Sequence, residues 1–160
     1  MPRAHRALDT VIALLQRVTR ASVRIDGQRV AAIDRGVLAL IGVEHADQNE
    51  EADALARRIH GIRMFADEQD RMNLDLISSN GAALLVPQFT LAADTTRGRR
   101  PGFSTAAPPD VASVLFDRLC ARFREPFADQ ASSRVATGVF GASMQVALVN
   151  DGPVTFLVRS

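Results

Sequence analysis

The spacing of apolar residues changes several times along this chain, and these changes constrain the fold more than any other feature. Strand-type patterns occupy residues 11–43, helical spacing covers 49–60, and a short apolar run at 82–86 indicates a buried strand. Helical spacing returns at 110–124, and strand patterns resume at 144. This order of elements in 160 residues predicts a single compact α/β domain.

Several short strands are expected in the first third of the chain. Residues 11–18 form an apolar run rich in β-formers, and the alternation at 21–25 is typical of a half-buried strand. Asp26-Gly27 is a turn signal that precedes a return strand at 30–33. A second turn then leads to a buried strand at 37–43.

The two helical segments carry apolar stripes, and the first also carries start and stop signals. Asp47 and Glu50 have capping-box spacing, and Gly61 stands where a C-cap glycine belongs. The stripe of the first helix consists of Ala52, Leu55, Ala56 and Ile59. The stripe of the second consists of Val111, Val114, Leu115, Leu119 and Phe123. Both helices are therefore expected to be amphipathic.

Two segments that follow strands could carry chemistry. In Pro87–Leu91, Phe89 could belong to the core, while Thr90 could be a nucleophile or a positioning hydroxyl. The long loop at 92–109 that follows is typical of functional segments, and its arginines, if not simply solvated, could hold phosphates. Those arginines are Arg97, Arg99 and Arg100.

The C-terminal strands surround a Gly-Pro pair. Met144, Val146 and Leu148 alternate up to Asn150-Asp151-Gly152-Pro153, and a further strand is expected at 154–158. The simplest interpretation of Gly152-Pro153 is a hairpin turn between two strands. The alternative is a cis peptide that directs backbone carbonyls into a pocket.

Charge and composition limit the possible partners. The net charge of +1, from 19 basic and 18 acidic residues, is small for a protein that grips a long nucleic-acid backbone. If the protein handles RNA, we expect it to hold a small part, such as an end, and we expect no DNA partner. Since no apolar run approaches the roughly 20 residues of a membrane helix, we expect no membrane association. Residues 1–10 are interpreted as a flexible extension of a domain at 11–160.

Neither a metal centre nor a cysteine nucleophile is expected. His5, His45 and His60 lack metal-ligand spacing, and Cys120 has no cysteine partner, so no metal and no cofactor are predicted. Cys120 is interpreted as a buried structural thiol. A lone cysteine also favours a reducing, cytoplasmic compartment.

The motifs together resemble the D-aminoacyl-tRNA deacylase family from Val11 to about Val158. The resemblance rests on Gln16-Arg17-Val18 with Ala21 and Val23, on Arg63–Asn73, on Gln88-Phe89-Thr90-Leu91, on Ala93-Asp94-Thr95, Arg100-Pro101 and Phe103, on Thr137-Gly138, Phe140, Met144, Val146 and Leu148, and on Asn150–Thr155. Two positions depart from the family pattern, since Pro87 and Gly102 each stand where a serine is usual. Pro87 lacks both the hydroxyl and the backbone donor of that serine.

The resemblance implies a mostly antiparallel, barrel-like β layer flanked by two main helices. It implies a homodimer in which Gly152 and a cis Pro153 of one chain face Gln88, Phe89 and Thr90 of the other. Arg17 resembles the arginine that fixes the Gly-Pro segment, and Phe140 and Met144 are expected to line the pocket.

The activity implied is hydrolysis of D-aminoacyl-tRNA, and of glycyl-tRNA mischarged on non-cognate tRNA, at the acceptor end. L-aminoacyl substrates would be rejected by steric conflict at the Gly-cisPro motif. Thr90 is interpreted as a positioning group rather than a covalent nucleophile. Three alternatives stay open: a general small-ester hydrolase, a non-catalytic module that binds tRNA ends, and a threonine-nucleophile hydrolase.

Overall fold

The computed structural model describes residues 11–160, and the extension predicted at 1–10 lies outside the described residues. The strands are β1 (Ile12–Ile25), β2 (Gln28–Ile33), β3 (Gly36–Gly42), β4 (Phe65–Ala66), β5 (Met72–Leu74), β6 (Ala82–Pro87), β7 (Val135–Thr137) and β8 (Gln145–Arg159). The helices are α1 (Asn49–Gly61), α2 (Pro109–Arg124) and the short α3 (Ala131–Arg134), with 3-10 turns η1 (Phe89–Ala92) and η2 (Glu125–Gln130).

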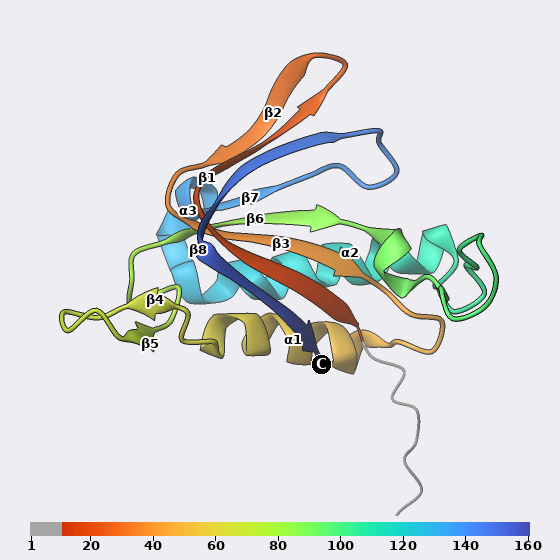
Figure 1. Cartoon of the computed structure of the whole chain (residues 1–160), viewed down its shortest axis with the longest axis horizontal. Coiled ribbons are helices and arrows are strands. Elements are labelled where there is room, and N and C mark those ends of the chain that lie inside the picture. Colours follow the sequence, from red (N-terminus) through yellow and green to blue (C-terminus); the bar gives the residue numbers. More distant parts are fainter. Residues whose placement is uncertain (1–10) are drawn as a thin grey trace, which may run out of the picture.

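One strongly curved sheet forms a nearly closed, barrel-like layer. Its strand order is β2-β1-β3-β6-β7, and β8 pairs with β1. β3, β6 and β7 are parallel to one another, while the other pairs are antiparallel. Both α1 and α2 lie on the same side of this sheet (Figure 1). The predicted α/β class, single domain and two main helices are confirmed.

Two segments predicted as separate strands are continuous in the structure. The predicted strands at 11–18 and 21–25 form the single strand β1, because register shifts around Val18 let the chain bend and continue. The predicted hairpin turn at Gly152-Pro153 is wrong for a related reason. Both halves of β8 pair with β1, and the Gly-Pro pair lies in a bulge between them.

Helix α1 begins at Asn49, as its helical spacing predicted, but its N-cap is not the predicted residue. The N-cap is Gln48, whose backbone N–H donates to the Glu51 carboxylate at 2.8 Å, so the predicted Asp47–Glu50 capping box is shifted by one position. Gly61 is the last residue of α1 and Ile62 is the extended C-cap, so the predicted C-cap glycine is wrong by one residue as well.

The buried face of α2 also differs from the prediction. Val114 is 65 % exposed and Val111 is 39 % exposed, although both were expected in the core. The side of the helix that faces α1 and the sheet instead consists of Ala112, Leu115, Phe116, Leu119, Cys120 and Phe123. Arg118 ties α2 to α1 through a bidentate pair with Asp53, with both N···O distances at 2.8 Å.

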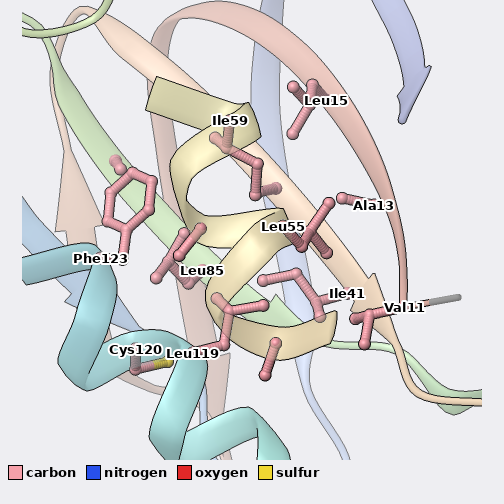
Figure 2. Close-up of a cluster of buried hydrophobic side chains, with 14 of the residues drawn as sticks. Val11, Ala13, Leu15, Ile41, Leu55, Ile59, Leu85, Leu119, Cys120 and Phe123 are labelled. Carbon is pink, nitrogen blue, oxygen red and sulfur yellow. The ribbon is translucent and has the colours of Figure 1, made fainter. Parts of the chain in front are cut away.

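The core has two parts because β3 and β6 are buried on both faces. Alternate side chains such as Ala39 and Leu85 point toward the helices, where they join Leu55, Leu119 and Phe123 in the larger cluster (Figure 2). The intervening side chains, which are Leu38, Leu84 and Val86, point into the barrel. There they form a second cluster with Val18, Ala21, Val23 and Ile33. The continuous apolar sequences of these parallel strands reflect that double burial.

Candidate active site

A cavity of about 390 Å³ opens where β6 ends. The backbone N–H of Gln88 donates to the Ile41 carbonyl at 2.7 Å, which fixes the exit of the chain from the sheet. The chain then turns into η1, which packs closely on β3 because residue 42 is a glycine. A β-carbon there would approach the Gln88 carbonyl to 3.0 Å and the Leu91 β-carbon to 2.9 Å. The cavity is lined by Val86, Pro87, Gln88, Phe89, Ala107, Pro109, Ala112, Phe140, Gly141, Ala142, Met144 and Val146.

The Gln88 and Thr90 side chains meet at the rim of this cavity. The Gln88 amide Nε2 donates to the Thr90 hydroxyl oxygen. Thr90 is exposed and does not line the cavity itself. The side-chain partner of the Thr90 hydroxyl is therefore an amide, rather than a histidine or carboxylate that could remove the hydroxyl proton.

Phe140 and Met144 also line the cavity. The Val139 N–H points at the Met144 sulfur at 3.4 Å, and a β-carbon on Gly138 would come within 2.9 Å of that sulfur. The Phe140 ring contacts Phe116 of α2, with centroids 6.5 Å apart. Backbone contacts and α2 therefore hold both side chains at the cavity that they line.

A second group of predicted residues surrounds the bulge in β8. Asn150 pairs with Val18 and Thr155 with Gln16, so residues 151–154 bulge opposite Arg17. The peptide bond between Gly152 and Pro153 in this bulge is cis.

Arg17 and Asn150 hold the bulge in place. The Arg17 guanidinium donates to the Met64 carbonyl at 2.8 Å and to the Asp151 carbonyl at 3.2 Å. The Asn150 amide donates to the carbonyls of Arg17 at 2.8 Å and Val154 at 3.0 Å. The bulge therefore has a defined shape, although Gly152 and Pro153 are exposed.

The structure brings the predicted site residues together as two groups rather than one. Gln88, Phe89, Phe140 and Met144 line the cavity, while Arg17, Gly152 and Pro153 do not. The start of α2, which supplies Pro109 and Ala112, was not predicted to line the cavity. The two adjacent prolines at 108–109 indicate only where a helix begins, since proline favours the first turn of a helix.

The comparison with known families decides the assignment. Residues 14–159 match the family model described as D-Tyr-tRNA(Tyr) deacylase. The chain belongs to this family. The match spans both residue groups, and it confirms the family and the enzyme class, a hydrolase, that the sequence motifs predicted.

Similar proteins cover nearly the full length of this deacylase-family chain. A Methylococcus capsulatus protein named D-aminoacyl-tRNA deacylase is 54% identical over 149 residues, which cover 93% of this chain and 94% of that protein. A solved structure titled c-Myc DNA Unwinding Element Binding Protein has 34% identity and a TM-score of 0.87, and the match covers 93% of this chain and 98% of that one. A probable eukaryotic D-amino acid tRNA deacylase, 20% identical with a TM-score of 0.81, shares the fold and covers 94% and 100%.

Among the described residues of this family member, none of those that line the cavity is titratable. Burial raises the pKa of the Cys120 thiol to about 12, which suits the structural role predicted for it.

Within residues 11–160, no three His, Cys, Asp or Glu side chains gather as a metal site would require. No helix in that range is long and apolar enough to cross a membrane.

Proposed function

We propose that this protein hydrolyses the ester bond of D-aminoacyl-tRNA and releases free amino acid and tRNA. The 54% identity to a protein named D-aminoacyl-tRNA deacylase supports the activity. The observation that carries the proposal in the structure is the cavity at the end of β6, which Gln88, Phe89, Phe140 and Met144 line together. Its volume of about 390 Å³ suits a small ester end group.

The chemistry needs little from the protein because an aminoacyl ester is already activated. The first N–H groups of a helical turn have no partner within that turn, so those of Phe89 and Thr90 would be the donors that stabilise an oxyanion. A water molecule attacks the carbonyl carbon, the C–O bond to the ribose breaks, and the proton passes to the leaving ribose oxygen. In this mechanism Thr90, held by Gln88, positions the attacking water or the substrate.

A homodimer would join the two residue groups. Gly152 and Pro153 lie outside the cavity of their own chain, although their surroundings fix them tightly. Along the described residues β8 pairs only with β1, and this long outer strand exposes Val149, Phe156 and Leu157, the last at 60 %. Because exposed apolar outer strands are normally covered, we propose that a second copy packs here and that its Gly152-Pro153 completes the site.

Selection between D and L substrates would follow from that arrangement. Carbonyls from the partner's bulge would bind the substrate ammonium group and occupy the side on which an L side chain must lie. A D side chain would point out of the site, and glycine, which has no side chain, would also be accepted. The proposed filter therefore excludes L-aminoacyl substrates by steric conflict, without recognising which amino acid is attached. It acts on tRNA in the cytoplasm.

The direct test is to incubate the protein with a D-aminoacyl-tRNA and, separately, with the ethyl ester of the same D-amino acid. We expect fast release from tRNA and slow release from the ethyl ester. Comparable rates on both would indicate a general small-ester hydrolase. Tight binding of tRNA without release of amino acid would indicate a binding module, and either result would contradict the proposal.

A further inference from the structure

The segment from Asp94 to Gly102, which follows η1 and precedes α2 in the chain, is a closed hairpin that projects from the molecule (Figure 1). Asp94 and Gly102 exchange two backbone hydrogen bonds, each 2.8 Å long. The Asp94 carboxylate accepts hydrogen bonds from the Thr96 backbone N–H at 2.9 Å and from its hydroxyl at 2.6 Å. The hairpin therefore has a built conformation, although it lies in a long loop.

Positive charge is concentrated at the tip of this hairpin. Arg97, Arg99 and Arg100 are all exposed, and Asp94 is the single acidic residue of the segment. The hairpin thus carries a net charge of +2, in a chain whose total is +1.

The three arginines differ from several other arginines of the protein, which have hydrogen-bond or ion-pair partners. Arg17, Arg118, Arg122, Arg134 and Arg159 each bind a carboxylate or a carbonyl. In the part of the chain that the structure describes, Arg97, Arg99 and Arg100 make no hydrogen bond or ion pair. Their donors are accordingly open to an external ligand.

The base of the hairpin is joined to the cavity wall. Phe103 follows Gly102, and its ring lies 5.3 Å from the ring of Phe89, which lines the cavity. Two residues further on, the Thr105 hydroxyl donates to the Ala92 carbonyl at the end of η1. The Thr105 carbonyl accepts the His45 N–H at 2.9 Å. A ligand held by the arginines is therefore held at a fixed place relative to the cavity.

We propose that the Asp94–Gly102 hairpin is a phosphate-binding arm, which grips the RNA backbone next to the esterified end bound in the cavity. This inference rests on the proposed function. A guanidinium group presents a planar fork that matches two phosphate oxygens, so exposed arginines suit this ligand. Phe103 lies five residue steps along the chain from Gly98, and these steps span at most about 17 Å at full extension. That distance corresponds to about five nucleotide steps at roughly 3.4 Å each.

The arm also fits the small total charge of the protein. A hairpin with a few arginines neutralises only a few phosphates, as expected for an enzyme that holds one end of an RNA. Phosphate contacts fix register and orientation without reading sequence. The arm would therefore serve tRNAs with different acceptor sequences about equally.

The test compares two variants that each remove two positive charges. Arg97→Ala/Arg99→Ala removes them from the arm, and the matched control Arg57→Ala/Arg58→Ala removes them from the exposed surface of α1 near its C-terminal end. Two readouts are taken over a series of KCl concentrations. One is the Kd for uncharged tRNA, and the other is kcat/KM on D-aminoacyl-tRNA and on the 3′-O-D-aminoacyl ester of adenosine, which carries no phosphate.

We expect the arm variant to bind tRNA at least about tenfold more weakly at low salt. The slope of log Kd against log salt should become shallower by about 1.4 to 1.8, since each lost contact removes about 0.7 to 0.9. Hydrolysis of the adenosine ester should be unchanged. A tRNA affinity and salt slope equal to those of wild type, or losses matched by the control variant, would overturn the arm. If the wild-type protein hydrolysed neither substrate, the proposed function would fail, while the salt slope of tRNA binding would still decide the arm.

Discussion

The Arg17 guanidinium lies against Gly152, with its Nη2 atom 3.3 Å from the position that a β-carbon on Gly152 would take. The same β-carbon would stand 2.7 Å from the Val154 side chain and 2.9 Å from the Val154 backbone nitrogen. Gly152 also has a φ of +126°, which L side chains rarely adopt. Position 152 therefore requires glycine, because of its backbone conformation and its contacts with Val154 and Arg17.

Gly152→Ala should displace the bulge in β8 and damage the site. We expect kcat/KM on D-aminoacyl-tRNA to fall by at least about tenfold, equivalent to about 1.4 kcal/mol of transition-state stabilisation. The control is Gly61→Ala at the end of α1, where a β-carbon meets nothing within 4 Å. That control should keep full activity. Equal activity of Gly152→Ala and Gly61→Ala would show that the bulge has no part in the site.

Arg17→Lys should weaken the support of the bulge while keeping the charge. One ammonium group cannot reproduce the fork that reaches both the Met64 and Asp151 carbonyls. We expect lower D-aminoacyl-tRNA hydrolysis and a smaller ratio of D to L hydrolysis, measured on matched substrates. Arg24→Lys, at an exposed position on the same strand, should change neither. An unchanged D to L ratio in Arg17→Lys would remove Arg17 from the account of selectivity.

Thr90→Ala should slow the reaction without abolishing it. The hydroxyl is held by the Gln88 amide, and loss of one such hydrogen bond typically costs up to about 1.5 kcal/mol, or about tenfold in rate. We expect no covalent aminoacyl-enzyme in wild type when reactions are quenched rapidly and analysed by mass spectrometry. An acyl group trapped on Thr90 would reverse this assignment and make Thr90 a nucleophile.

His60 should make stability depend on pH near neutrality. Burial lowers the pKa of His60 below 6.5, against the opposing effect of its hydrogen bond with the Phe123 carbonyl, 2.8 Å from Nε2. The neutral form is thus favoured in the folded state. Its stability contribution is complete above about pH 6.5 and is lost as the pH falls from there toward the lowered pKa, since the unfolded chain then binds the proton first.

The measurement is the urea midpoint of unfolding between pH 7.5 and pH 5. We expect the midpoint to fall with pH in wild type and to fall less steeply in His60→Phe, which cannot titrate. His60→Phe leaves the Phe123 carbonyl without its partner, so a uniform loss of stability is expected at every pH. Only the slope is diagnostic, and identical slopes in the two proteins would contradict the assignment.

Much of the fold followed from apolar spacing because most elements bury one defined face. The continuous run at 37–43 became a parallel strand buried on both sides, and the two helices appeared within about a residue of their predicted bounds. The errors occurred where tertiary pairing overrides local signals. Gly152-Pro153 has the composition of a turn, yet β8 continues through it because β1 pairs on both sides of the bulge.

The cavity was only partly predictable for a similar reason. Gln88 and Phe89 follow a buried strand, and Phe140 and Met144 entered through the family resemblance; all four line the cavity. Ala112 and Pro109 could not be assigned because their roles depend on how α2 packs across the sheet, and no local pattern encodes that angle. The predicted face of α2 included Val111 and Val114 for the same reason. The pairing of Arg17 with the bulge depends on strand register, so it entered through the family resemblance and not through a local pattern.

The most direct test is the decay of matched D-aminoacyl-, L-aminoacyl- and glycyl-tRNA with this protein in the presence of a strong chelator. We predict that the D and glycyl esters are lost fast, that the L ester shows no added loss, and that the chelator has no effect. Equal loss of the D and L esters would contradict the proposed steric filter at Gly152-Pro153.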